Sequence, residues 1–387
     1  MFDSKRLEDY LRLLVHYGNS SLLPTNARAI RVQNIRKLTG GMANNVYSFC
    51  LKFSEGDSEQ VRNLVLKGYN NRVSLWFGVV HPDEDARQYV REYDTLQALA
   101  RVGFPVPQAY LYETDSFFLG YPFLIMRHEI AVQEKGNRLK LISFANTLAA
   151  LHNLDLNKLG IKSLRVPKEN SEFAMERLIC LKRFMRETRH YNFLKKNFNF
   201  AMDWLESNVG NIGCPKYCLI HGEYHPGHTL LTNDGKRTVI DWENAKIGDP
   251  AFDVGYAYNL VKVMYNQENI DSGEDFAETF LSEYSKSSKE DVNERLEFYK
   301  VVSLLGVAIV VSSWIADPID AYRNFGKEAL ARALAFPFFR SSFLANRWLN
   351  RDFLVSYLQY CQNFIKTTLK RLLYFSKALA QAGLFQN

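Results

Sequence analysis

Residues 219–228 of the chain read LIHGEYHPGH. They are followed by IDWE at residues 240–243 and by GDPAFD at residues 248–253. In the first two segments, apolar residues run directly into a polar loop that contains an acid. Short apolar runs bounded by such loops are typical of buried strands. The pattern therefore predicts two strands that each deliver a loop with a carboxylate.

The second of these strands follows a tight turn. Asn-Asp-Gly at residues 233–235 predicts a hairpin, after which residues 238–240 form the strand that ends at Asp241. We expect Glu223 and Asp241 to lie at the ends of adjacent strands and to face one reacting group and one metal ion. Phosphoryl transfer uses this arrangement, because one carboxylate orients the attacking hydroxyl group and another holds Mg²⁺ on the nucleotide.

The chain resembles the aminoglycoside phosphotransferase and choline kinase family, whose members are small-molecule relatives of the protein kinases. That family reads His-Gly-Asp, four residues, Asn, then Ile-Asp-Trp/Phe-Glu and Gly-Asp-Pro with a following Asp. This sequence departs from the pattern twice, with Glu223 in place of the catalytic Asp and His228 in place of a metal-binding Asn. The resemblance implies transfer of the γ-phosphoryl group of ATP to a hydroxyl group of a small molecule.

The resemblance also implies an α+β, protein-kinase-like two-lobed fold. Residues 1–128 are expected to form a nucleotide-binding N-terminal lobe, in which a leading helix precedes a small, mainly antiparallel sheet with one helix. Residues 129–387 are expected to form a larger, mainly helical C-terminal lobe. This second lobe would carry the catalytic and metal loops and the substrate site.

The spacing of apolar residues supports the same order of elements. Predicted strands lie at residues 35–38, 46–53, 63–68, 109–113 and 123–126. Predicted helices lie at residues 85–102, 139–154 and 171–208, the last one broken near Asn197. Residues 127–129 connect the two lobes.

The nucleotide is expected to contact a glycine turn and the connection between the lobes. Gly40 and Gly41, with Asn44, lie between two predicted strands. Glycines let backbone N–H groups approach phosphate oxygens closely, although Gly-Gly between strands is also common in simple hairpins. The segment resembles the family's phosphate-binding loop. Met126 and His128 are expected to meet the adenine through their backbone.

Lys67 ends an apolar strand, and Glu92 shares a predicted helical face with Leu96. A lysine in such a place is often only a surface residue whose stem lies over apolar neighbours. The resemblance implies instead that an ion pair with Glu92 holds Lys67 ready for the α- and β-phosphates. Glu84 and Asp85 are alternatives to Glu92 in that pair.

The motif residues have distinct expected roles. Glu223 orients the acceptor hydroxyl group, and His221 braces the loop without transferring a proton. Asp241 is the principal Mg²⁺ ligand, with Glu243 in support. His228 occupies the second metal position, where imidazole is a poor substitute for an amide oxygen on Mg²⁺. The second metal is therefore expected to be missing, to be bound through water or to be a softer ion such as Mn²⁺.

Two other interpretations of the motif remain open. A pseudokinase would bind a nucleotide or metabolite with little or no transfer, because Glu223 is one methylene longer than Asp. A metal-dependent hydrolase would use His221, His225 and His228 as ligands and Glu223 as base. The spacing of the three histidines matches no familiar zinc motif, and this interpretation leaves Lys67 unexplained.

Composition bounds the class of protein. With 387 residues, 47% of them apolar and 14% aromatic, the chain is long enough to bury two lobes. The N-terminus lacks the apolar core of a secretory signal, and the five cysteines are scattered, so we expect a reduced cytoplasmic protein. The apolar run at residues 301–316 is shorter than a membrane span and predicts a buried helix.

The C-terminal region is unusually basic. Residues 321–387 carry ten Lys or Arg residues and two acidic ones, among many aromatic residues. Helices that pack their aromatic side chains inward would explain the pattern; peripheral membrane or lipid-like substrate contact is the alternative. Nucleic acid is not expected as a partner. The positive charge disfavours a polycationic acceptor and leaves neutral or anionic metabolites as acceptors.

Overall fold

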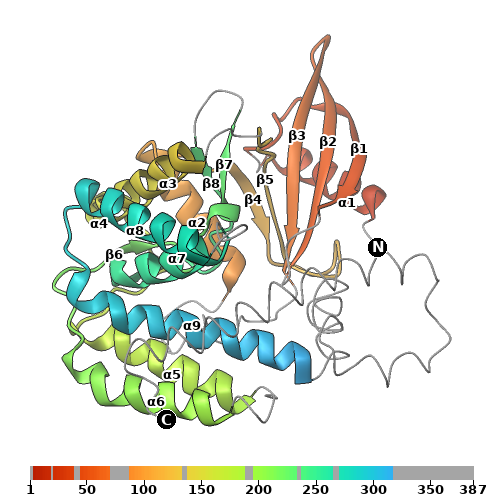
Figure 1. Ribbon diagram of the computed structural model, residues 1–387. Coiled ribbons are helices and arrows are strands. Elements are labelled where there is room, and N and C mark those ends of the chain that lie inside the picture. Colours follow the sequence, from red (N-terminus) through yellow and green to blue (C-terminus); the bar gives the residue numbers. More distant parts are fainter. Residues whose placement is uncertain are drawn as a thin grey trace, which may run out of the picture.

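The computed structural model describes residues 3–18, 21–38, 44–69, 87–132, 137–187, 195–232, 237–264 and 270–316. Within these residues, a five-stranded sheet with a helix on its outer face occupies one side of the molecule (Figure 1). Helices and two short sheets occupy the other side. Gly40, Gly41 and the basic region at residues 321–387 lie outside the described residues.

The large sheet has the strand order β1-β2-β3-β5-β4, and every neighbouring pair is antiparallel. Its strands are β1 (Arg28–Lys37), β2 (Asn45–Glu55), β3 (Ser58–Gly68), β4 (Ala109–Glu113) and β5 (Phe123–Arg127). The register pairs Val46 with Lys67 and Lys67 with Leu124, which places these three side chains on one face. Leu66 points to the opposite face, because side chains alternate along a strand.

Helix α1 (Ser4–Tyr17) covers that opposite face. Asp3 caps the helix, since its side chain accepts a hydrogen bond of 3.1 Å from the Arg6 N–H group. Leu7 and Leu11 are fully buried in one apolar cluster with Leu66 and other residues of the sheet. The leading helix therefore stabilises the sheet from outside.

Helix α1 also covers the outer edge of β1. Glu8 Oε1 accepts a hydrogen bond of 2.7 Å from the Val32 N–H group. Arg12 Nη2 donates to the Ile30 carbonyl oxygen at 3.3 Å. Polar backbone groups at this edge thus find partners on a helix instead of on a further strand.

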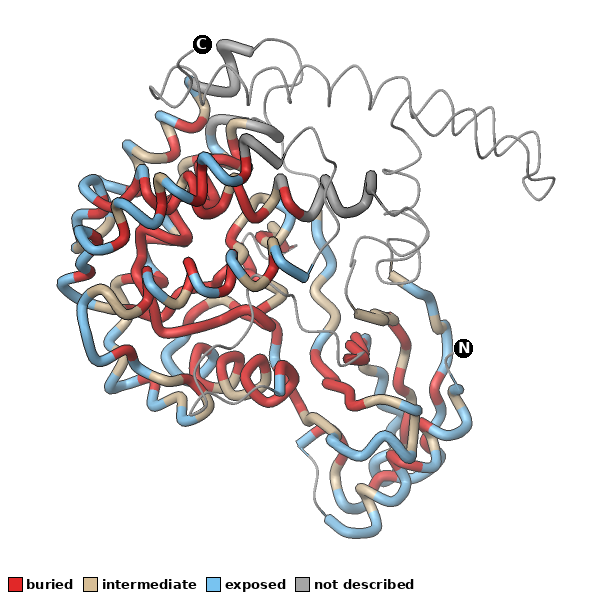
Figure 2. Tube along the Cα trace, turned by 90° about the horizontal axis from the view of Figure 1, so that it is seen from below, coloured by how far each residue is buried: buried red, intermediate tan, exposed pale blue. Residues whose placement is uncertain are grey.

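The rest of the described chain is mainly helical. Its helices are α2 (Gln88–Arg101), α3 (Asn137–His152), α4 (Leu156–Leu159), α5 (Glu172–Glu187), α6 (Lys195–Asn208), α7 (Pro250–Met264), α8 (Ile270–Ser287) and α9 (Asn293–Ala316). Strand β6 (Cys218–Ile220) pairs with β9 (Lys246–Gly248), and β7 (Thr229–Leu231) pairs with β8 (Arg237–Val239). One apolar core runs from α2 and the inner face of the sheet to α9, and its buried residues line the inner sides of the helices (Figure 2).

The connection after β5 binds the second short sheet. The Val132 N–H group donates to the Leu231 carbonyl oxygen at 2.8 Å, and Ala131 forms an isolated bridge with Thr232. The chain that leaves the large sheet is therefore fixed beside the β7–β8 hairpin. The division into lobes at residues 128 and 129 stays a prediction.

Most predicted elements are confirmed, with clear exceptions. Strand β1 begins at Arg28 rather than at residue 35. The predicted break in the helix at 171–208 is confirmed, since α5 and α6 are separate helices, but it lies before Lys195 rather than near Asn197. The prediction that the two acids follow adjacent strands is wrong. Strand β6 pairs with β9 and β8 pairs with β7, so Glu223 and Asp241 follow strands of different sheets. Among the described residues, no helix is long and apolar enough to cross a bilayer.

Arg295 in α9 forms a buried ion pair with Asp249, which precedes α7; Nε lies 2.8 Å from Asp249 Oδ2. We expect Arg295→Met to lower the free energy of unfolding by about 3–5 kcal/mol, because Asp249 then remains buried without a counter-charge. Lys286→Met, which breaks a more exposed pair with Glu283, is the control and should cost less than about 1 kcal/mol. Urea denaturation measures both values, and equal losses would contradict this account.

Candidate active site

Lys67 lies at the centre of the site. Its Nζ atom is 2.8 Å from Glu92 Oε2, 2.5 Å from Asp241 Oδ1 and 2.8 Å from Glu243 Oε2. The lysine comes from β3, Glu92 from α2, and the other two acids from the loop after β8. The predicted ion pair between Lys67 and Glu92 is therefore present. It is part of a larger cluster that joins the sheet to the rest of the chain.

Both carboxylate oxygens of Glu92 have partners. The Tyr69 hydroxyl group donates to Oε2 at 2.5 Å, and the Trp242 N–H group donates to Oε1 at 3.3 Å. Glu92 is almost completely buried, so these bonds replace the water that its charge would otherwise attract. The carboxylate of Glu92 thus connects α2 to strand β3 and to the loop that contains Asp241.

The charges of the cluster depend on one another. Burial alone would lower the pKa of Lys67, but Asp241, Glu243 and Glu92 together raise it well above its usual value. Burial would raise the pKa of Asp241, but Lys67 and His228 outweigh it and lower that pKa. Burial raises the pKa of Glu243, and the charge of Lys67 offsets only part of that increase. The charges of Asp241 and Glu92 raise the pKa further, so it reaches about 8. The same cluster therefore shifts the pKa values of Asp241 and Glu243 in opposite directions.

Asp241 has an unusual backbone conformation, with φ of +68°. This left-handed region is disfavoured for most residues but is several-fold enriched in Asp and Asn. Strained backbone of this kind clusters at functional sites. Here it turns the chain between the end of β8 and the buried Trp242, whose Nε1 donates to the Val239 carbonyl oxygen at 2.9 Å.

The loop after β6 is fixed by buried hydrogen bonds. Asp253 in α7 accepts bonds from the N–H groups of His221 and Gly222, at 2.7 and 2.8 Å. The His221 ring bridges two loops, because Nε2 donates to the Ile240 carbonyl oxygen at 2.9 Å and Nδ1 accepts from the Glu223 N–H group at 3.2 Å. Both ring nitrogens are occupied, which matches the bracing role expected for His221.

Glu223 is held at both carboxylate oxygens. Asn244 Nδ2 donates to Oε2 at 3.0 Å, and the Tyr256 hydroxyl group donates to Oε1 at 3.3 Å. Burial raises the pKa of Glu223; His228 and the two hydrogen bonds oppose this shift, and Asp241 adds to it. The carboxylate is therefore fixed in direction and lies within the electrostatic reach of Asp241.

The three histidines do not form a metal triad. The His225 Nδ1 atom accepts a bond from the Gly227 N–H group at 3.0 Å, and His228 Nδ1 lies 3.0 Å from the Glu223 carbonyl oxygen. Among the described residues, one group of three side chains places its ligand atoms close enough together to hold one metal ion: Glu92, Asp241 and Glu243. No histidine belongs to this group. This geometry argues against the metal-dependent hydrolase.

The remaining predicted nucleotide residues lie around the cluster. Asn44 Nδ2 donates to Glu243 Oε2, which ties the end of the glycine turn to the Asp241 loop. Met126 pairs with Val65 inside the sheet, and the His128 N–H group donates to the Asn63 carbonyl oxygen at 3.0 Å. That donor is therefore engaged within the sheet, and the contact of Met126 and His128 with adenine stays a prediction.

Sequence reasoning missed the two residues that hold the carboxylate of Glu223. Asn244 directly follows the IDWE motif, and Tyr256 stands three residues after Asp253 on α7. Residues three apart share one face of a helix, so Tyr256 points to the same loop that Asp253 binds. This spacing is the signal that could have identified it.

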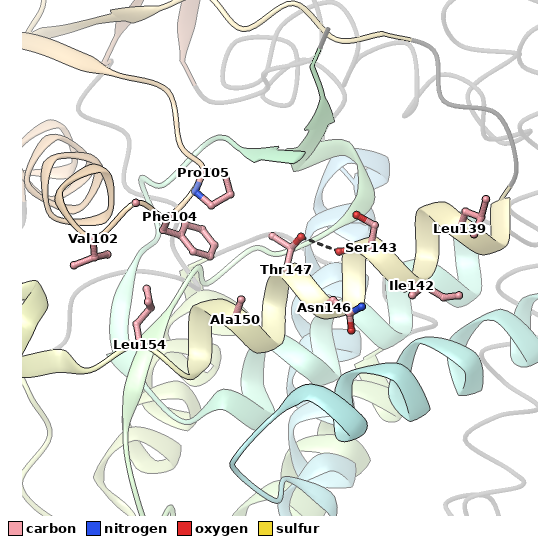
Figure 3. A pocket seen from close by; sticks show the side chains of 11 residues that line it. Val102, Phe104, Pro105, Leu139, Ile142, Ser143, Asn146, Thr147, Ala150 and Leu154 are labelled. Carbon is pink, nitrogen blue, oxygen red and sulfur yellow. Dashed lines mark hydrogen bonds between the residues drawn. The ribbon is translucent and has the colours of Figure 1, made fainter. Parts of the chain in front are cut away.

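A separate cavity of about 570 Å³ lies between α3 and the connection from α2 to β4 (Figure 3). Most of its wall is apolar, and the polar Thr147 donates to the Ser143 carbonyl oxygen at 2.7 Å. Phe104 in this wall packs edge-on against Trp242, with ring centroids 6.1 Å apart. None of the predicted site residues that the structure describes lines the cavity.

Comparison with known proteins identifies the class. The model of the phosphotransferase enzyme family matches residues 51–299 of this chain, and the chain belongs to that family. Acyl-CoA dehydrogenase family member 11 of Gallus gallus is 28% identical over an alignment of 184 residues, and the match covers 45% of this chain and 23% of that relative. The match thus spans less than a quarter of the relative's length.

Solved structures show the same fold. A thermostable mutant of aminoglycoside phosphotransferase APH(4)-Ia, in a ternary complex with ADP and hygromycin B, aligns with a TM-score of 0.51 and 17% identity over 85% of this chain and 97% of that one. Choline kinase LicA from Streptococcus pneumoniae aligns with a TM-score of 0.51 and 16% identity over 85% and 99% of the two chains. The predicted α+β, protein-kinase-like two-lobed fold is confirmed.

Gly222 has φ of +84°, and a Cβ atom there would lie 2.3 Å from the Asn244 carbonyl oxygen. Gly56, in the turn between β2 and β3, has φ of +60° but open space around it. Gly56→Ala should therefore cost only the left-handed strain of about 1–2 kcal/mol. Gly222→Ala should cost about 1–3 kcal/mol more, because the backbone must also move. Equal losses in thermal or urea denaturation would show that the close contact is unimportant.

His221 should remain neutral to unusually low pH. Burial, followed by the charge of His228, lowers its pKa to about 4. Since an unfolded histidine titrates near about 6.5, the unfolded state gains the proton first, and stability falls as pH drops from about 6.5 to 4 by about 3 kcal/mol. Ring NMR of His221 tests the shift directly. A midpoint near 6.5 in the folded protein would contradict it.

Proposed function

We propose that this protein transfers the γ-phosphoryl group of ATP to a hydroxyl group of a small molecule. The observation that carries the proposal is the Lys67 cluster, in which a buried cation joins Glu92 to Asp241 and Glu243. Phosphoryl transfer depends on positioning and on charge stabilisation more than on covalent chemistry by the protein. A fixed lysine beside acidic residues of the loop after β8 would supply both the positioning and the charge stabilisation.

The nucleotide would lie between the sheet and the Asp241 loop. Lys67 would contact the α- and β-phosphates, while Glu92 keeps its side chain extended. Gly40, Gly41 and Asn44 would cover the phosphates, and the segment of Met126 and His128 would meet the adenine. Nucleotide use is supported by the ADP complex of the related aminoglycoside phosphotransferase.

The acidic residues suit a divalent metal ion. Carboxylate oxygens are the hard ligands that Mg²⁺ prefers, and Asp241 and Glu243 both face Lys67 from one loop. Asp241 would be the principal ligand, supported by Glu243. When bound, such an ion neutralises negative charge on the nucleotide phosphates.

Glu223 would orient the acceptor hydroxyl group and accept its proton. The bonds from Asn244 and Tyr256 support this role, because they fix a side chain that is one methylene longer than the usual Asp. Burial also raises the pKa of Glu223, which makes its carboxylate a stronger proton acceptor. These contacts favour active transfer over a pseudokinase.

The acceptor would be a small molecule. The related aminoglycoside phosphotransferase was solved with hygromycin B, and the other related structure is named a choline kinase. A neutral or anionic hydroxyl compound is our expectation, since the region at residues 321–387 is basic. A polycationic acceptor would require an acidic surface near Glu223.

The test is transfer from γ-labelled ATP into a small-molecule cell extract with Mg²⁺ or Mn²⁺. Asp241→Asn should reduce labelling at least about a hundredfold, because it removes the charge but keeps a residue type that tolerates positive φ. Asp57→Asn, in the exposed turn between β2 and β3, is the matched control and should label like the original protein. Labelling that survives Asp241→Asn would contradict the assignment. Nucleotide binding without any product would identify a pseudokinase.

A further inference from the structure

Three arginine side chains share one face of the edge strand β1. They are Arg28, Arg31 and Arg36, and the register pairs them with Ser54, Lys52 and Ser48 of β2 in that order. Paired residues point to the same face of a sheet, and so do alternate residues of one strand. The three arginines therefore form a row on the face that carries Lys52, with steps of about 7 and 14 Å along the strand. We call these three residues the arginine row.

The alignment of the row depends on two irregularities in β1. In an uninterrupted strand, Arg31 would face away from Arg28 and Arg36, because side chains alternate. One extra residue before Arg31 and another after it reverse this alternation. Ala29 and Asn34 lie in these two bulges, with φ of +50° and +54°. Alanine rarely adopts such a left-handed conformation, so β1 accepts backbone strain where it turns the arginines to one side.

The charges of the row are not neutralised by the residues around it. All three arginines are exposed, and within the described part of the chain none of their guanidinium groups has a hydrogen-bond or ion-pair partner. Glu59 lies on the same face but forms an ion pair of 3.2 Å with Lys52. Val61, which pairs with Lys52 on the other side, is 51% exposed. The row is therefore open to an anion from solution.

Protection of the sheet edge does not explain this alignment. Charged side chains and bulges do hinder the pairing of edge strands. Backbone groups of β1 are already occupied by Glu8 and Arg12 of α1, however, and protection of an edge does not require charges to share a face. Aligned guanidinium groups suit phosphate groups, because each planar fork can donate two parallel hydrogen bonds to phosphate oxygens.

We propose that the arginine row binds a small molecule that carries at least two phosphate groups. Arg28 and Arg31 are close enough to contact one such molecule together, and a longer molecule reaches Arg36. The row shares its face with Lys67, which pairs with Val46 of β2. Sheet spacings place the Cα atoms of Arg36 and Lys67 about 12 Å apart. The bound molecule therefore lies beside the Lys67 cluster but uses none of its residues, so this site goes beyond the proposed function.

NMR titration of the full chain with inorganic tripolyphosphate tests the proposal. The Nε–H signals of the arginine side chains, assigned by single substitutions, report binding at the row itself. Binding of the same probe at the Lys67 cluster is thereby kept separate. We expect the signals of Arg28 and Arg31 to shift together and to give one dissociation constant. Signals of the row that do not move would overturn the proposal.

Three substitutions separate the geometry of the row from net charge. Arg31→Gln should weaken binding about tenfold or more, because it removes a charge-assisted contact. Arg31→Lys keeps the charge but loses the planar fork, and should weaken binding at least about threefold. Lys37→Gln is the matched control, since Lys37 is exposed on the same strand but pairs with Tyr47 on the opposite face. It should change the affinity less than about twofold. Equal losses from Arg31→Gln and Lys37→Gln would overturn the site, because only net charge would then attract the probe.

Vesicles that contain phosphatidylserine distinguish a small molecule from a lipid surface. An anionic surface attracts basic residues through their charge and is sensitive to salt. We expect Arg31→Lys to bind such vesicles like the original protein, although it binds tripolyphosphate more weakly. Vesicle binding that requires Arg31, without any binding of tripolyphosphate, would overturn the assignment to a small molecule.

Discussion

The structure depends on the burial of one ammonium group. An unpaired lysine in this position would lose its charge or destabilise the fold, because burial of an isolated charge is very unfavourable. Three carboxylates compensate the charge of Lys67, and they come from α2 and from the loop after β8. The sheet, α2 and the Asp241 loop must therefore assemble together, so the same interaction that allows the fold also places the acids.

A second set of contacts fixes the loop of Glu223. Asp253 binds two backbone N–H groups of this loop, and its Oδ2 also lies 3.3 Å from His152 Nε2. His152 in turn contacts the Tyr284 hydroxyl group at 2.8 Å. A chain of buried polar groups thus leads from the loop of Glu223 through α3 to α8. The position of Glu223 is set by the helical part, and that of Lys67 by the sheet.

Much of this arrangement could be predicted from the sequence, because it is encoded locally. The apolar strand and the helical face locate Lys67 and Glu92, and the family resemblance implies that the two residues pair. Strand β1 was harder to delimit, since the alternation at Ile30 and Val32 is interrupted by a register shift after Gln33. The partner of β6 could not be found from local pattern, because strand pairing between distant segments is decided by packing of the whole core.

Helix α1 has a consequence for self-association. Its Glu8 and Arg12 side chains occupy backbone groups of β1 that a further strand would otherwise bind. Sheet edges left open in this way recruit strands from other molecules. The leading helix therefore acts as a steric and hydrogen-bonding cap that disfavours pairing of separate copies of the chain through the β1 edge, independently of any part it plays in stability.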